Sequence, residues 1–91
     1  MLHQQHLEPE VLILKMDEVI TMDASALHTL QGLAAKLKRR GKHLILSGPH
    51  TQPYFLMHDA GFFDELGHDN VCGSLENALK RARILRNSSP T

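Results

Sequence analysis

The chain has little of what several classes of protein depend on. It has 91 residues with one cysteine and no tryptophan, and its aromatic residues are one tyrosine and three phenylalanines. A single cysteine excludes an internal disulfide framework and fits a reducing compartment. No apolar run approaches the roughly 20 residues of a membrane-spanning helix. The opening residues, MLHQQHLEPE, lack the basic-then-apolar pattern of a secretory signal. We therefore expect one soluble cytoplasmic domain with a modest core.

The chain also has no net charge, because ten Lys and Arg balance ten Asp and Glu. A balanced chain has no global field to favour nucleic acid or an acidic membrane, so no nucleic-acid partner is expected. Seven histidines could suggest metal binding, but they are scattered along the sequence and no second cysteine completes a zinc-type pair with Cys72. We expect no metal site and no cofactor. The histidines are His3, His6, His28, His43, His50, His58 and His68.

The first recognisable unit is a short apolar run followed by an amphipathic helix. Residues 11–15 read VLILK without alternation, which predicts a strand covered on both faces. In the connecting segment 17–23, Val19 and Ile20 are expected to point inward. A strand that feeds directly into a helix is the unit of a parallel α/β sheet.

The helix that follows has clear signals at both ends. Asp23 or Ser25 is placed to cap its first turn, and Gly41 is placed to end it. Basic residues gather at its C-terminal end, where the helix dipole favours them. Its apolar stripe is Leu27, Leu30, Leu33, Ala34 and Leu37.

The rest of the chain repeats the strand-helix order twice. The pattern predicts a buried strand at 43–46. It then predicts a short helix that starts near Pro53 and ends at Gly61, followed by an edge strand at 70–72. Ser74 is expected to cap a last helix. The aromatic residues expected in the core are Tyr54, Phe55, Phe62 and Phe63. The apolar stripe of the last helix is Leu75, Ala78, Leu79, Ala82 and Leu85.

The predicted fold class is therefore α/β, with the order β-α-β-α-β-α in a mostly parallel sheet and helices packed on it. Residues 11–86 would form the domain, residues 1–10 the remnant of a helix or linker, and residues 87–91 a disordered tail. Three strands are few for a parallel sheet, which suggests that strands before residue 11 are missing.

Four landmarks resemble the STAS domain, the fold of anti-sigma factor antagonists and of the C-terminal cytoplasmic domains of SulP-type anion transporters. They are VLILKM, TMDASALHTL, LILSG and AGFFDELG. The sequence of these landmarks is most similar to the transporter subgroup, where an Asp-Ala-Ser/Thr-Gly/Ala turn followed by Leu-His is typical. The resemblance implies a domain trimmed at its N-terminal end, on the cytoplasmic face of the inner (plasma) membrane.

The turn TMDASALH is the candidate regulatory and partner-binding site. In anti-sigma factor antagonists the residue after the Asp is a phosphorylated serine; here that position is Ala24, which has no hydroxyl. Ser25 is an alternative phosphoacceptor, but capping of the helix by Asp23 and Ser25 is the favoured interpretation. Because carboxyl ends of parallel strands share one edge, Met22 and Pro49 are expected to flank the site and His28 to line it.

No catalytic constellation is recognised, so no enzymatic activity is expected. Cys72 lacks a nearby base, and Ser47 near His50 lacks a hydrolase elbow. The resemblance implies a regulatory interaction domain of a SulP-like transporter, with a protein partner at the turn and the membrane domain of the same transporter as a second partner. Alternatives are a stand-alone anti-sigma factor antagonist-like protein that binds a kinase or phosphatase, or a nucleotide-binding module. An open sheet edge also predicts a homodimer of this fragment.

Overall fold

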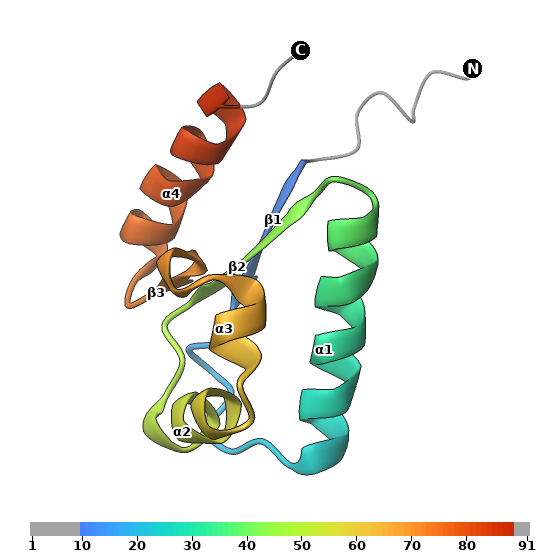
Figure 1. The fold of residues 1–91 in the computed structure, drawn as a ribbon. Coiled ribbons are helices and arrows are strands. Elements are labelled where there is room, and N and C mark those ends of the chain that lie inside the picture. Colours follow the sequence, from blue (N-terminus) through green and yellow to red (C-terminus); the bar gives the residue numbers. More distant parts are fainter. Residues whose placement is uncertain (1–9, 89–91) are drawn as a thin grey trace, which may run out of the picture.

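A computed structural model describes residues 10–88 and shows a small parallel sheet between two layers of helices (Figure 1). The strand order is β1-β2-β3, and both pairings are parallel. The strands are β1 (Val11–Lys15), β2 (His43–Ser47) and β3 (Val71–Cys72). The helices are α1 (Ala24–Arg39), α2 (Thr51–Asp59), α3 (Phe62–Leu66), the 3-10 turn η2 (His68–Asn70) and α4 (Leu75–Ser88). The predicted β-α-β-α-β-α order is confirmed, with α3 as an additional short helix.

Strand β2 lies in the centre of the sheet, and its side chains form both parts of the core. Leu44 and Leu46 join a buried cluster with residues of α1, α2 and α3 on one face. Ile45 points to the opposite face and is fully buried, as is Ala78 of α4. The expectation of a strand covered on both faces is correct for β2.

The same expectation is wrong for β1, which forms one edge of the sheet. Leu12 is 37% exposed, and Val11, Ile13 and Leu14 are half-buried. The apolar run alone does not distinguish a central strand from an edge strand, because the neighbours of a strand are set by the whole fold. Among residues 10–88, no strand pairs with the outer edge of β1.

Other expected core positions are also exposed. Val19 packs against the core, but Ile20 is 63% exposed and does not point inward. Phe62 and Phe63 are buried as predicted, whereas Tyr54 and Phe55 of α2 lie at the surface. Tyr54 and Phe55 are exposed because α2 has its Pro53 and Met57 side against the core and the small sheet leaves its other side without cover.

Helix α4 covers the sheet with only part of its predicted stripe. Ala78 is fully buried and Ala82 and Leu85 are half-buried, but Leu75 and Leu79 are exposed. The helix continues to Ser88, so residues 87 and 88 are helical although the sequence assigned them to a tail. The expectations for residues 1–9 and 89–91 lie outside the described residues.

Candidate interaction site

The predicted turn lies at the carboxyl edge of the sheet, where β1 and β2 end side by side. Lys15 pairs in register with Ser47, so the segments that follow the two strands start at the same level. The Met16 N–H donates to the Ser47 carbonyl over 2.8 Å. Segment 17–23 then leads to α1, and segment 48–50 leads to α2. The two segments therefore run below the sheet at the same end of the domain (Figure 1).

Three side-chain hydrogen bonds hold these segments together. The Met22 N–H donates to Gln52 Oε1 over 2.7 Å, and Gln52 Nε2 donates back to the Met22 carbonyl over 3.1 Å. The ring of His50 donates through Nε2 to the Asp17 carbonyl. Gln52 thus satisfies both backbone polar groups of Met22 as a neighbouring strand would. The turn is held in position before any partner arrives.

Each of the predicted site residues is at least partly accessible. Asp23, Ala24, Ser25 and His28 are exposed at the start of α1. Met22 and Pro49 are half-buried. Met22 itself accepts from Gln52, and Pro49 directly precedes His50. The structure therefore brings the six residues to one edge of the sheet.

Of the two candidate caps, Asp23 is the residue that caps α1. Its backbone is extended, and its Oδ1 accepts from the Ala26 N–H over 2.8 Å. Ser25 is the second residue of the helix itself. Ser74 caps α4 in the predicted way, because its Oγ accepts from the Asn77 N–H over 3.2 Å.

Replacing Asp23 by alanine is expected to lower the free energy of unfolding by about 1 kcal/mol, because the Ala26 N–H loses its acceptor. Asp23→Asn keeps a side-chain oxygen at the cap and is expected to stay close to the parent. Urea denaturation followed by far-UV circular dichroism measures both variants. Equal losses in the two variants would show that the carboxylate charge, and not the cap, carries the stabilisation.

Sequence reasoning missed Gln52 as a part of this site. The partner of Gln52 is 30 residues away along the chain, and that of His50 is 33 residues away. Nothing in the local pattern of residues 51–53 marks a glutamine that reaches across to another loop. Such contacts follow from the docking of α2 under the sheet.

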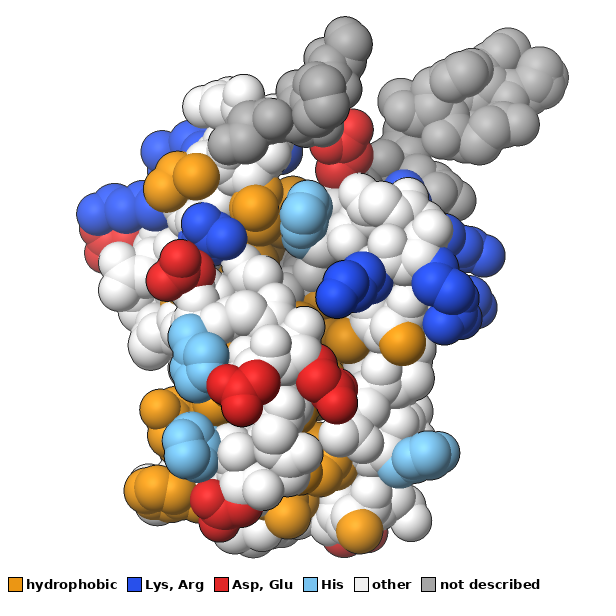
Figure 2. All heavy atoms as spheres, in the orientation of Figure 1, with side chains coloured by type: hydrophobic (Ala, Val, Ile, Leu, Met, Phe, Trp, Pro, Cys, Tyr) orange, Lys and Arg blue, Asp and Glu red, His pale blue; other side chains and the backbone are white. Residues whose placement is uncertain are grey.

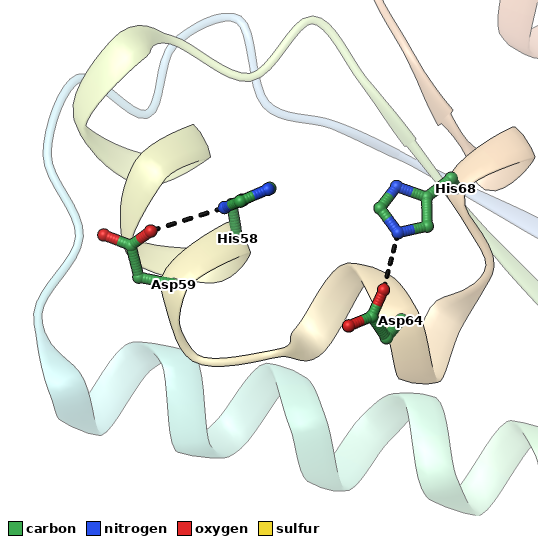
Figure 3. Close-up of polar contacts among 4 residues, drawn as sticks. All are labelled: His58, Asp59, Asp64 and His68. Atoms are coloured by element: carbon green, nitrogen blue, oxygen red, sulfur yellow. Dashed lines mark hydrogen bonds and ion pairs between the residues drawn. The ribbon is translucent and has the colours of Figure 1, made fainter.

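A second group of polar side chains lies on α2, α3 and η2 (Figure 3). His58 Nδ1 is 3.3 Å from Asp59 Oδ1, and His68 Nε2 is 2.7 Å from Asp64 Oδ1. The two pairs flank the ring of Phe63, which contacts both histidine rings edge-on. Within residues 10–88, no three His, Cys, Asp or Glu side chains come together in a way that could hold a metal ion.

The one cysteine is poorly suited to nucleophilic chemistry. Burial raises the pKa of the Cys72 thiol, and the nearby Arg81 charge only partly opposes this effect. The thiolate is the reactive form of cysteine, so a raised pKa lowers its reactivity at neutral pH. The thiol instead lies 3.8 Å from the Asp69 carbonyl, where it serves as a weak donor.

A groove of about 580 Å³ lies away from this edge, between the end of α1, the start of β2 and α3. Its wall includes basic Lys38 and His43 and acidic Glu65, together with apolar Ala34 and Leu66. The groove does not include any of the predicted site residues. The candidate site therefore lies outside this groove.

Comparison with known proteins places this fold and turn in a family. The sequence profile of the STAS domain matches residues 2–78, and the chain belongs to the STAS domain family. It is 32% identical over 71 residues to Sulfate transporter 1.2 of Arabidopsis thaliana, an alignment that covers 78% of this chain.

Two solved structures share the fold. A sulfate transporter family protein from Wolinella succinogenes superposes with a TM-score of 0.82 at 32% identity, over 88% of this chain and 66% of that one. The SulP transporter STAS domain from Vibrio cholerae gives 0.81 at 27% identity, over 89% of this chain and 63% of that one. The chain is thus related to the STAS domains of sulfate transporters.

The relatives are much longer proteins. The chain spans 11 to 14% of the length of the curated relatives that it matches. Within residues 10–88, no helix has the length and apolarity to cross a membrane.

Proposed function

We propose that this STAS domain is a non-catalytic regulatory module of a SulP-like anion transporter, and that it works on the cytoplasmic side of the membrane. The surface around residues 22–28 and Pro49 would bind a cytoplasmic protein partner, and the membrane domain of the same transporter would be a second partner. The observation that carries the proposal is the pair of hydrogen bonds from Gln52, which fix the backbone of Met22 beneath exposed side chains. A surface ordered in advance loses less entropy on binding.

The chemistry of the turn supports constitutive binding in place of a phosphorylation switch. Ala24 has no hydroxyl, and the Asp23 carboxylate is engaged with the helix backbone. Ser25 is exposed one residue further on, inside the first helical turn. The raised pKa of Cys72 is consistent with the absence of thiol catalysis.

The test is anion uptake in cells that carry the full gene with a changed turn. Ser25→Arg places a long cation in the middle of the proposed interface and is expected to lower sulfate uptake at least threefold without loss of the protein from the membrane. Asn77→Arg is the matched control, because Asn77 is also a polar, exposed residue in the first turn of a helix. Equal uptake in the two variants would contradict a role for the turn.

A stand-alone anti-sigma factor antagonist-like protein is the main alternative, and fractionation of cells of the source organism separates the two. An antibody against the domain is expected to detect a band in the membrane fraction that is much heavier than 10.2 kDa. A soluble band near that mass would contradict the transporter proposal and favour a kinase or phosphatase partner.

A further inference from the structure

The parallel fold places the basic ends of two helices at the same end of the domain. Helices α1 and α4 run opposite to the strands, so both end at the amino edge of the sheet (Figure 1). The Lys and Arg residues other than Lys15 all belong to α1, to the turn after it, or to α4. A basic residue near a helix C-terminus is favoured by the helix dipole. Two helices with that preference, packed on one sheet, gather their charges at the amino edge.

Six of these cations are exposed and have no acidic side chain within ion-pair distance among residues 10–88. Lys80 lies 3.9 Å from Glu76, and Arg81 donates to Asn70, so neither is included in this group. We call the group the basic end. It consists of Lys36, Lys38, Arg39, Arg40, Arg83 and Arg86.

Most carboxylates lie towards the other end of the molecule. Asp17, Glu18 and Asp23 are in the segment that follows β1, and Asp59 and Asp64 are in the layer of α2 and α3. In Figure 2, the visible Lys and Arg side chains lie in the upper half of the face, together with some carboxylates and a histidine, while the lower part shows carboxylates and histidines without Lys or Arg. Glu10, just before β1, Glu76, near the start of α4, and Glu65, which lines the same groove as Lys38, are exceptions to the separation.

The zero net charge of the chain therefore conceals a concentration of exposed cations at one end of the domain. Helix α1 has 16 residues and is about 24 Å long at 1.5 Å per residue. The screening length in about 0.1 M salt is near 10 Å. A charged surface in contact with the basic end is thus attracted by that end and is largely screened from the acidic loops.

We propose that the basic end is a docking surface for an anionic phospholipid membrane. The exposed Ile84, which is 55% accessible, lies one helical turn after Lys80 and Arg81 on α4, and Arg83 and Arg86 project from other sides of the same helix end. An apolar side chain among cations can enter the interfacial region of a bilayer, and anionic headgroups attract the cations around it. Phosphates of a nucleic acid would use the cations but not Ile84, so a lipid surface fits the group of side chains better.

This docking surface goes beyond the proposed function and is separate from it. The basic end lies at the amino edge of the sheet, and the turn at residues 22–28 lies at the carboxyl edge. A domain docked in this way would present its turn away from the membrane, towards the cytoplasm. Changes at one surface are expected to leave binding at the other unchanged, so the two proposals can fail independently.

The test is co-sedimentation of the 91-residue chain with vesicles. We expect binding to phosphatidylcholine vesicles that contain about 30% phosphatidylglycerol, no binding to pure phosphatidylcholine, and release as NaCl rises from about 50 to about 300 mM. The double variant R39Q/R40Q is expected to lower the partition coefficient roughly tenfold. R83Q/R86Q is expected to lower it to a similar degree, because both helix ends face the membrane.

Lys15→Gln is the matched control, compared with the single variant Arg40→Gln. Both remove one exposed cation, but Lys15 is at the carboxyl edge of the sheet. Equal losses in these two variants would overturn the proposal, since total charge and not position would then decide binding. No binding to anionic vesicles at low salt would overturn it as well, as would equal affinity for a DNA duplex. Unchanged binding of Ser25→Arg to the vesicles would support the separation of the two surfaces.

Discussion

Replacing Phe62 by alanine is expected to lower the free energy of unfolding by about 3–5 kcal/mol. Phe62 has 0% exposure and lies in the cluster where α1, α2 and α3 meet β2. Removing its ring leaves a cavity that a small core cannot close without moving α3, a helix of only five residues. Small domains have total stabilities of about 5–15 kcal/mol, so the variant is expected to lose a large part of its stability.

Phe55→Ala is the matched control for this prediction. Phe55 is the same residue type but is 55% exposed on α2, and its loss is expected to cost less than about 1 kcal/mol. Urea denaturation followed by circular dichroism compares the two variants. If Phe55→Ala costs as much as Phe62→Ala, the surface position of Phe55 is wrong, and another element must cover α2 in solution.

The second large effect is expected at Asn70, a buried polar residue that links three elements. Its Nδ2 donates to the Leu66 carbonyl at the end of α3 over 2.9 Å, and its Oδ1 accepts from Arg81 Nε of α4 over 2.8 Å. Asn70→Ala leaves the carbonyl and the guanidinium without this partner. We expect a loss of about 2–3 kcal/mol, because unpaired polar groups away from water cost more than a single hydrogen bond contributes.

Asn77→Ala is the control for Asn70→Ala, because the side chain of Asn77 is exposed on α4. Its loss is expected to change stability by less than about 0.5 kcal/mol. Asn70→Asp offers a finer comparison, since the carboxylate can still accept from Arg81 but cannot donate to Leu66. A stability of Asn70→Asp equal to that of the parent would contradict a contribution from the bond to Leu66.

Local signals in the sequence were sufficient for the elements of the fold. Asp23 and Ser74 each cap the predicted helix, and Gly61, at a φ of 78°, follows the end of α2 where a left-handed residue is favoured. These signals act over three or four residues, so they are present in the sequence itself. The order of strands and helices follows from them.

The exposed positions of the fold could not be predicted in the same way. Leu12, Ile20 and Phe55 are as apolar as their buried neighbours, and only the number of layers around them decides their exposure. A three-stranded sheet leaves β1 at an edge and one side of α2 uncovered. Hydrophobicity indicates what a side chain favours, whereas burial depends on what the rest of the fold places beside it.

The candidate site also has features that the sequence reveals and features that only the fold reveals. The turn with Asp23 and Ala24 was evident from the sequence, because the polar residues follow an apolar run and precede a helix. Its attachment through Gln52 was not, because that contact joins residues 30 positions apart.

The sequence by itself determined the helix caps, the succession of strands and helices along the chain and the basic C-terminal ends of the two long helices, since each of these depends on neighbours within a few residues. Only the tertiary structure decided that Gln52 holds Met22 and that the basic ends of α1 and α4 lie together at one edge of the sheet. The physical reason is that both helices run antiparallel to the strands of one parallel sheet, so their C-terminal ends lie at the same edge of that sheet. Cations that are balanced in the sum over the chain are thereby gathered at one end of the folded domain.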